Sequence, residues 1–327
     1  MSSLSLLIDA DGWHAVSDEM FTDENVVRIA HAFARYLTAL PEPQQHTIAV
    51  AYDGRRLSRA RASLVAAVLS SYGIHVFLSH ALIPTPVLSF AVRRLSCSAG
   101  VMITAGALPP RCNGIIFKDA TGEPFLREET TNVAANLPQE AEPYTPRPEE
   151  IELTDFLPAY IGELRTLVDF PLLQTFGEDP RNHAAVIIDS MGGAGQTILE
   201  DLLAPCGWRA QTIFGTAAPD FYDRVPETKP HNIEPLMYNV SVTDTLFGIA
   251  TDGDAGRCAV VYDDGECVTP QETDRALAWH LRENKKWPVG YHPHIPDKDG
   301  ILTALFFTEM IAAAGTSLRA IIGALHT

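Results

Sequence analysis

Two acidic side chains lie close together in the stretch DGDAGR, which follows an apolar run. Asp252 and Asp254 are two residues apart, so their carboxylates can direct oxygens into one small volume, as a hard cation such as Mg²⁺ requires. The same residues also fit an Asp-rich turn in which side chains bond the backbone. The stretch therefore predicts either a weak divalent-cation site or a structural turn.

Basic residues and glycines follow two other apolar runs. In DGRR at residues 53–56, the guanidinium of Arg55 could capture a phosphate or belong to an exposed, solvated charge run. GGAG at residues 192–195 precedes a helix-like segment and could present backbone N–H groups to a phosphate. It lacks the lysine of a P-loop and the glycine spacing of a dinucleotide site, so a structural turn is the other interpretation.

The stretch ITAGALPP at residues 103–110 ends a further apolar run without a side chain that could act as nucleophile, base or metal ligand. By itself it predicts a turn. His292 and His294 have no cysteine or acid at ligand spacing, and the neighbouring prolines favour a loop over a metal site. We therefore assign no catalytic residue.

Strand-like and helix-like segments alternate along the chain, and this order places the candidate stretches at strand ends. Helices are expected at residues 21–37 and 57–73, with short buried strands between them and after them. Such alternation is typical of βαβ units with a mostly parallel sheet, which bind ligands at the carboxyl ends of their strands. PQEAEPYTPRPEE at residues 138–150 breaks the pattern. We predict three α/β domains, at residues 1–140, 151–245 and 246–327.

The composition limits the partners of the protein. The 327 residues include 41 acidic and 24 basic side chains, a formal charge of −17. This charge opposes binding to nucleic acid and to anionic membranes. No apolar run reaches the roughly 18 residues that a membrane span needs, and the N-terminus lacks a basic, secretory-type start. We expect a cytoplasmic protein without nucleic-acid or membrane partners, in which an anionic ligand needs a locally basic pocket.

Taken in order, these segments resemble the α-D-phosphohexomutases, the phosphoglucomutase and phosphomannomutase superfamily. The resemblance runs through AYDGRRLS, LIPTPVLSFAVRRLSCSAGVMITA, PPRCNGI, LFGIATDGDAGRCAVVYDDGECVTPQE and PHIPDKDGILTALFFTEMIA. It implies three consecutive phosphohexomutase-type α/β domains with mixed, mostly parallel sheets. Compared with the family pattern, the third domain is expected to be shortened and the fourth to be absent.

Members of this superfamily carry the transferring phosphoryl group on a serine, hold Mg²⁺ with D-G-D-A-D and that phosphate, and turn over a bisphosphorylated sugar. By the resemblance, Gly106 stands where the phosphoserine belongs, and Ala107 and Leu108 replace the next histidine and asparagine. Ile116 replaces a lysine, and Gly256 replaces the third metal carboxylate. The resemblance thus implies that the catalytic group is lost.

Several family positions remain occupied by residues that could bind a ligand. Arg55 and Arg257 are predicted to bind the phosphate of a sugar phosphate, together with His14, which stands where the family's opening loop has an arginine. Asp252 and Asp254 are predicted to hold a metal ion, and with two carboxylates we expect Mg²⁺ binding to be weak. No other cofactor is expected.

We expect a catalytically degenerate phosphohexomutase-like protein, a pseudoenzyme with a binding, regulatory or assembly role in carbohydrate metabolism. The alternative is an enzyme of altered chemistry on a phosphorylated sugar or nucleoside, using Asp252, Asp254 and nearby histidines. A homo-oligomer, or a hetero-oligomer with another enzyme, is also expected, because ILTALFFTEMIAAAG and SLRAIIGAL are more apolar than one packing face requires. The same helices could instead cap the third sheet.

Overall fold

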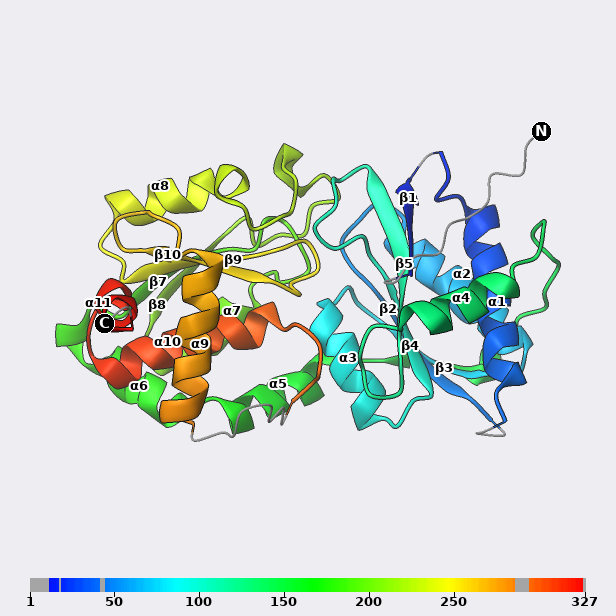
Figure 1. Ribbon diagram of the computed structural model, residues 1–327, viewed down its shortest axis with the longest axis horizontal. Coiled ribbons are helices and arrows are strands. Elements are labelled where there is room, and N and C mark those ends of the chain that lie inside the picture. The colour runs from blue at the N-terminus through cyan, green and yellow to red at the C-terminus, as the bar shows by residue number, and fades with distance from the viewer. Residues whose placement is uncertain (1–11, 18, 42–44, 286–293, 326–327) are drawn as a thin grey trace. The chain divides into compact units, whose positions relative to one another are not determined.

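The computed structural model describes residues 12–17, 19–41, 45–285 and 294–325 (Figure 1). The chain divides into two compact units. Unit 1 comprises the chain up to Tyr160 together with Ile295–Asp297, and unit 2 comprises Ile161–His294 and the chain from Lys298 onward. His292, considered above as a metal ligand, lies outside the described residues.

Unit 1 is built on a six-stranded sheet with the order β1-β5-β4-β2-β3-β6. The pairs β2–β3, β2–β4 and β3–β6 are parallel, whereas β5 runs antiparallel to β4 and to β1. The expected mixed, mostly parallel sheet is confirmed. The strands are β1 (Gly12–Val16), β2 (Thr47–Tyr52), β3 (His75–Ser79), β4 (Ala99–Ile103), β5 (Cys112–Lys118) and β6 (Ile151–Thr154).

Helices cover both faces of this sheet (Figure 1). α3 lies on one face, and α1, α2 and α4 lie on the other. The rings of Phe33 and Phe117 stack between α1 and β5 with centroids 4.6 Å apart, which joins the helix layer to the sheet. The helices are α1 (Asp23–Ala39), α2 (Ser58–Ser71), α3 (Thr85–Arg94) and α4 (Arg127–Ala135).

The proline-rich segment at residues 138–150, where we expected the first domain boundary, packs within unit 1. Its main chain is bound to the helices, because Arg28 Nε donates to the Pro138 carbonyl at 3.0 Å and the Arg147 N–H donates to Ser70 Oγ at 3.1 Å. A 3-10 turn (Pro148–Glu150) then leads into β6, which extends the sheet beside β3. The division between the units falls inside α5 (Leu157–Leu167) instead.

Unit 2 has a four-stranded sheet with the order β10-β9-β7-β8. β7 is parallel to both β8 and β9, and β10 is antiparallel to β9. The boundary expected at 245/246 therefore does not separate compact units, because main-chain hydrogen bonds between β7 and β9 join the two sides of it in one sheet. The strands are β7 (Ala185–Asp189), β8 (Arg209–Ile213), β9 (Phe247–Thr251) and β10 (Cys258–Tyr262).

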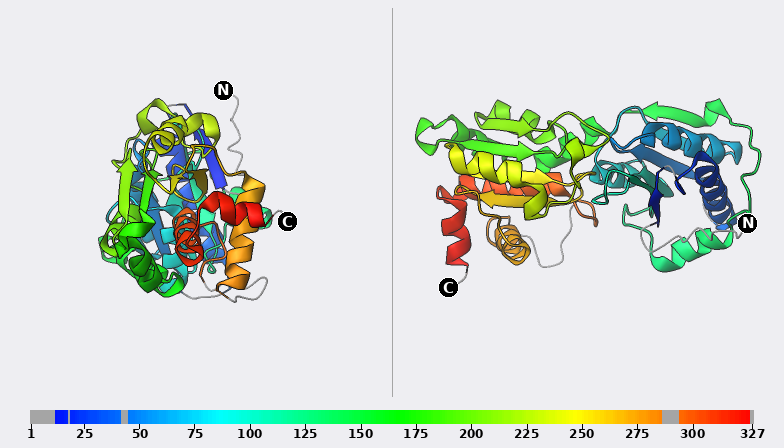
Figure 2. Two further views of the ribbon diagram at one scale, coloured as in Figure 1. Left: turned by 90° about the vertical axis from the view of Figure 1, so that its left-hand side faces the viewer. Right: turned by 90° about the horizontal axis from the view of Figure 1, so that it is seen from above.

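Helices also cover the sheet of unit 2 on both faces. α8 lies on one face, and α7 and α10 lie on the other (Figures 1 and 2). The helices are α6 (Phe170–Glu178), α7 (Ile198–Leu203), α8 (Glu234–Val242), α9 (Pro270–Glu283), α10 (Gly300–Ala314) and α11 (Leu318–Ala324). Short 3-10 turns lie at Pro180–Asn182, Ala204–Cys206, Phe221–Asp223 and Pro230–Asn232.

The apolar side chains of α10 are covered within unit 2. The helix packs against α6, α7, α9 and β10, and its large apolar residues are all buried: Leu305, Phe306, Phe307, Met310 and Ile311. The apolar surplus from which we expected a subunit contact is therefore explained by packing inside the chain. No single helix in the described ranges is long and apolar enough to cross a membrane, and α10 and α11 reach that length only as a pair bent by 86°.

One carboxylate is buried within α10. Glu309 Oε1 lies 2.5 Å from Lys285 Nζ, and its Oε2 lies 3.7 Å from His280 Nε2. His280 Nδ1 is 2.9 Å from the Asn284 amide nitrogen, which can only donate, so Nδ1 accepts and Nε2 presents its N–H to Glu309. We call His280, Lys285 and Glu309 the Glu309 cluster.

Candidate functional site

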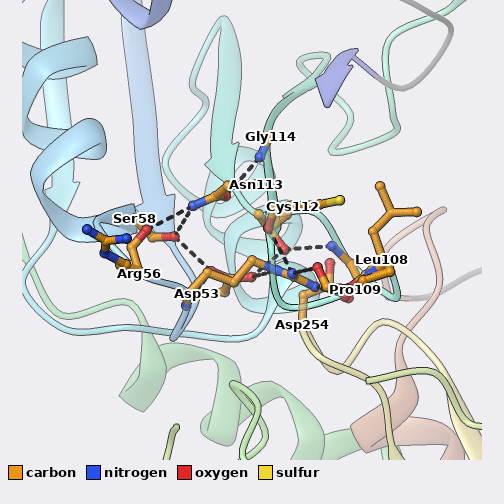
Figure 3. A network of polar contacts seen from close by, with 12 residues as sticks. Asp53, Arg56, Ser58, Leu108, Pro109, Cys112, Asn113, Gly114 and Asp254 are labelled. Carbon is orange, nitrogen blue, oxygen red and sulfur yellow. Dashed lines mark hydrogen bonds and ion pairs between the residues drawn. The ribbon is translucent and has the colours of Figure 1, made fainter. Parts of the chain in front are cut away.

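The first candidate site, in unit 1, is organised by a carboxylate at the end of β2. Asp53 is buried and accepts hydrogen bonds from Thr104 Oγ1 at 2.7 Å and from Ser58 Oγ at 3.0 Å. Ser58 in turn accepts from the Asn113 amide at 2.9 Å, as Figure 3 shows. Burial raises the pKa of the Asp53 carboxyl, and the charge of Arg55 and these hydrogen bonds oppose that shift. The network connects the ends of β2 and β4 to the start of β5.

Arg55 lies inside this network and not on the surface. Its Nε donates to Asp53 Oδ2 at 3.1 Å. Its two terminal nitrogens donate to four main-chain carbonyls of the following loop, at distances between 2.6 and 3.0 Å: Gly106, Leu108, Pro109 and Cys112. A guanidinium has five N–H donors, so all of them are engaged. The predicted phosphate-binding role is therefore corrected: Arg55 is buried and holds the shape of the loop.

The loop at residues 104–112 carries one hydroxyl, and that hydroxyl is not available for chemistry. Thr104 is fully buried, donates to Asp53 and accepts from the Gly106 N–H at 2.9 Å. Gly106 has a φ of +53°, a left-handed conformation that favours glycine. Leu108 is 42% exposed at the position where the family pattern has asparagine. The loop is thus held by hydrogen bonds, with an apolar side chain facing outward and no available hydroxyl nucleophile.

His14 is brought to the same loop by strand pairing. In the ladder between β1 and β5 it is the partner of Gly114, and a Cβ built on Gly114 would lie 2.4 Å from the His14 ring. A glycine is therefore required at 114 for the ring to lie there. His14 is half-buried, so its phosphate-binding role stays a prediction.

Lys118 is a cationic residue of unit 1 that the sequence did not reveal. It lies on β5, two residues after Ile116, and strand alternation places both on one face of the sheet. Its Nζ is 2.5 Å from Asp297 Oδ2, which also accepts from Ser89 Oγ at 3.2 Å. Lys118 is buried, so the pair is shielded from solvent. The alternation could have suggested Lys118, but its partner is 179 residues away in the sequence.

The second candidate site, in unit 2, is the acidic turn after β9. Asp252 and Asp254 are both buried, and Asp252 Oδ1 accepts the Arg257 N–H at 2.9 Å. Asp254 Oδ1 lies 3.4 Å from the Gly256 nitrogen, which donates to it. Side chains therefore bond the backbone as expected for an Asp-rich turn. Burial, reinforced by the charge of Asp254, raises the pKa of Asp252 well above its ordinary value. The Arg257 side chain is exposed beside this turn.

The donors in this turn do not make a dedicated metal site. Within the described ranges, no three or more His, Cys, Asp or Glu side chains are grouped so that they could hold a metal ion. Asp252 and Asp254 are the two carboxylates present, and Gly256 supplies no third. Such a pair could contribute to Mg²⁺ binding only if water or a ligand's phosphate filled the other positions.

We expect Mg²⁺ to bind this chain with a dissociation constant of about 1 mM or weaker, because hydration competes with two carboxylates. Isothermal titration calorimetry of the full chain measures this. Asp252→Asn combined with Asp254→Asn is the matched control, since it removes both charges with little change in side-chain size. Micromolar binding that disappears in the control would contradict the prediction.

The glycine stretch at residues 192–195 is a structural turn. The N–H groups of Gly192, Gly193 and Ala194 donate to main-chain carbonyls at 2.9, 2.7 and 2.9 Å, so they are not presented to a phosphate. The carbonyl that Ala194 binds is that of Gly253, and a Cβ on Gly193 would approach this carbonyl oxygen to 2.7 Å. The glycines thus allow close contact with the acidic turn.

A buried ion pair at the end of β7 also escaped the sequence reading. Asp189, the last residue of β7, is fully buried and receives two hydrogen bonds from Arg224, at 2.8 and 3.1 Å. The Arg224 guanidinium lies 4.2 Å from the ring centre of Phe214. Asp189 follows an apolar run, which is typical of a strand end, but no local pattern indicates a partner 35 residues later.

Comparison with family models identifies both units. Residues 6–143 match phosphoglucomutase/phosphomannomutase α/β/α domain I, and residues 158–265 match α/β/α domain II of the same family. The second match runs across the expected boundary at 245/246, in agreement with the single sheet of unit 2.

Individual relatives agree with these matches. A Methanopyrus kandleri protein named as a phosphoglucosamine mutase is 31% identical over 82% of this chain and 56% of its own length. A Thermococcus kodakarensis phosphoglucomutase/phosphomannomutase is 27% identical over 84% of this chain and 59% of its own length. The chain thus spans little more than half the length of these relatives. A crystal structure from Thermus thermophilus, named as a phosphomannomutase, gives a TM-score of 0.88 at 29% identity, covering 98% of this chain and 83% of that one.

Proposed function

The chain belongs to the phosphoglucomutase/phosphomannomutase family, and from this premise we propose that it binds a sugar phosphate without transferring the phosphoryl group. In this proposal it is a pseudoenzyme with a regulatory or assembly role in carbohydrate metabolism, acting in the cytoplasm. We also propose that the chain associates with a second copy of itself or with another enzyme, because a protein that does not turn over a substrate acts through what it binds.

The observation that carries the proposal is the structure of the loop at residues 104–112. Phosphoryl transfer through a covalent intermediate needs an accessible nucleophilic side chain, which in the family pattern is the serine hydroxyl. The loop has Gly106 at the family's serine position, and its one hydroxyl, on Thr104, is buried and bonded to Asp53. Four loop carbonyls are bound by Arg55, so the loop is held in this arrangement. These contacts support the proposal that the loop keeps its shape but has no accessible hydroxyl to carry the phosphoryl group.

The proposed binding function rests on two side chains that could contact a phosphate, His14 and Arg257. His14 lies against the glycine that follows this loop, and Arg257 is exposed beside the acidic turn of unit 2. In a chain with a net charge of −17, a phosphate is attracted to an exposed cation such as the guanidinium of Arg257, and His14 can add a hydrogen bond.

The proposal is tested by incubating the purified protein with glucose 1-phosphate and glucose 1,6-bisphosphate. We expect no glucose 6-phosphate in a coupled assay and no added phosphate in the intact mass, whereas calorimetry is expected to detect binding. The control is the Asp252→Asn, Asp254→Asn variant purified in parallel, because a contaminating mutase would contribute equally to both samples. Turnover or stoichiometric phosphate found only on the natural chain would contradict the proposal and favour altered chemistry.

Restoring the serine is not expected to restore the enzyme. We predict that Gly106→Ser neither interconverts glucose phosphates nor retains phosphate, because Ala107, Leu108 and Ile116 still offer no acid, base or cation. A side chain at φ +53° is also expected to lower the free energy of unfolding by about 1–2 kcal/mol. Gly106→Ala is the matched control: it has the same backbone strain without a hydroxyl. Phosphate on the serine variant alone would show that only the nucleophile is missing.

A further inference from the structure

A pocket of about 490 Å³ lies in unit 1, between the segment at residues 142–147 and the helices α1 and α2. Its lining includes His31, Tyr72, Glu142, Tyr144 and Arg147. Tyr72 directly follows α2 and leads into β3, so the pocket is at the amino edge of the parallel strands. The loop at residues 104–112 follows the carboxyl end of β4, at the opposite edge of the same sheet. The pocket is thus separate from the family's catalytic loop.

The wall of the pocket is held in place by polar contacts. His31 is buried, and its Nε2 donates to the Glu142 carbonyl at 3.1 Å. The other ring nitrogen, Nδ1, is hydrogen-bonded to the Tyr72 hydroxyl at 3.0 Å. The rings of Tyr72 and Tyr144 each lie edge-on to His31, with centroids 5.7 and 6.0 Å away. Two aromatic rings are therefore fixed at the pocket by a buried side chain.

The charges at the pocket favour an anion. The lining carboxylate, Glu142, is already ion-paired with Arg35, and Arg35 holds the pKa of this carboxyl below its ordinary value. The lining guanidinium, Arg147, is exposed and has no ion pair within the part of the chain that the structure describes. The uncompensated charge is therefore positive, although the chain as a whole is strongly acidic. An arginine in this state suits bidentate binding of a phosphate.

From these contacts we propose that the pocket binds a phosphomonoester with a ring, such as a sugar phosphate or a nucleoside monophosphate. The phosphate pairs with Arg147, and the ring lies against Tyr72 and Tyr144. The volume is within the range of small-ligand pockets. This is a second, effector-type site that does not depend on the function proposed for the loop at residues 104–112.

The test uses the full chain and two probes, AMP and glucose 6-phosphate, in isothermal titration calorimetry and hydrogen exchange read by mass spectrometry. At least one probe is expected to slow amide hydrogen exchange in residues 138–147, the segment that forms one wall of the pocket. Arg147→Ala is expected to weaken that binding about 10-fold or more, and Tyr144→Ala several-fold. Arg94→Ala, an exposed arginine at the end of α3, is the matched control and is expected to bind normally.

Comparison of AMP with glucose 6-phosphate shows which ring the pocket binds, and binding of either probe supports the proposal. No saturable binding of either probe up to about 10 mM would overturn it. Binding that is unchanged in Arg147→Ala, or that protects only residues near 104–114, would overturn it as well. The latter pattern would still support sugar-phosphate binding by the family site, so the two proposals fail separately.

Discussion

Replacing Arg55 with methionine is expected to lower the free energy of unfolding of unit 1 by about 3–5 kcal/mol. The variant loses five hydrogen bonds and leaves the Asp53 carboxylate buried without its cation. The carbonyls of the loop at residues 104–112 also lose their donors, so that loop is expected to exchange its amide hydrogens faster. Hydrogen exchange read by mass spectrometry measures both effects and resolves unit 1 from unit 2.

Two variants make the result for Arg55 specific. Arg59→Met removes an exposed guanidinium from the start of α2 and is expected to change stability by less than about 0.5 kcal/mol. Asp53→Asn removes the charge that Arg55 neutralises, so its combination with Arg55→Met should cost less than the sum of the two single changes. Additive costs, or an Arg55→Met variant as stable as Arg59→Met, would show that the buried network does not hold unit 1 together.

The second large effect is expected from Lys285→Met, which leaves Glu309 buried without its closest cation. We expect unit 2 to lose about 3 kcal/mol at neutral pH, as breaking a buried pair typically does. Lys285→Met with Glu309→Gln is the matched control, because it has no buried carboxylate, and it should be the more stable of the two variants. Urea denaturation followed by circular dichroism measures the difference, and equal stability of the two would contradict it.

The Glu309 cluster also predicts that the free energy of unfolding depends on pH, and that the sign of this dependence is reversed in Lys285→Met. Burial raises the pKa of Glu309, but His280 and Lys285 outweigh it, so the pKa in the folded protein is below its ordinary value. The carboxylate therefore adds stability above the unfolded pKa of about 4.3, and this is lost as the pH falls through the lower folded pKa. In Lys285→Met burial dominates, the folded pKa is raised, and stability should instead fall as the pH rises above about 4.3. Parallel pH profiles in the natural chain and the variant would contradict this account.

Much of the site could be predicted from local sequence, because its residues follow apolar strands. Asp53 and Asp252 lie directly after β2 and β9, where the alternation of strands and helices predicted them. The direction of the Arg55 side chain could not be predicted in this way. It depends on carbonyls 51–57 residues later in the chain. The local sequence of a charged residue at a strand end is the same whether its side chain faces solvent or a loop.

The first expected boundary, between 140 and 151, agrees with the gap between the two family-model matches, but the compact units divide further along the chain, within α5. A proline-rich stretch is usually a linker, but residues 138–147 are bound to α1 and α2 by hydrogen bonds that no local pattern reveals. The boundary at 245/246 was placed where a new strand and acidic turn begin, yet β9 pairs with β7 about 60 residues earlier. Strand order is set by contacts that are distant in sequence, whereas strand positions are set by local apolar runs.

The position of Asp297 affects how this protein can be divided into fragments. Unit 1 consists of two pieces of chain, and the smaller one, Ile295–Asp297, brings the carboxylate that neutralises the buried Lys118. A recombinant fragment that stops near Tyr160 would retain the whole sheet and all its helices but would contain an ammonium group with no counterion. Unit 1 is therefore continuous in space but not in sequence, and a single protease cut does not release it as a self-sufficient module.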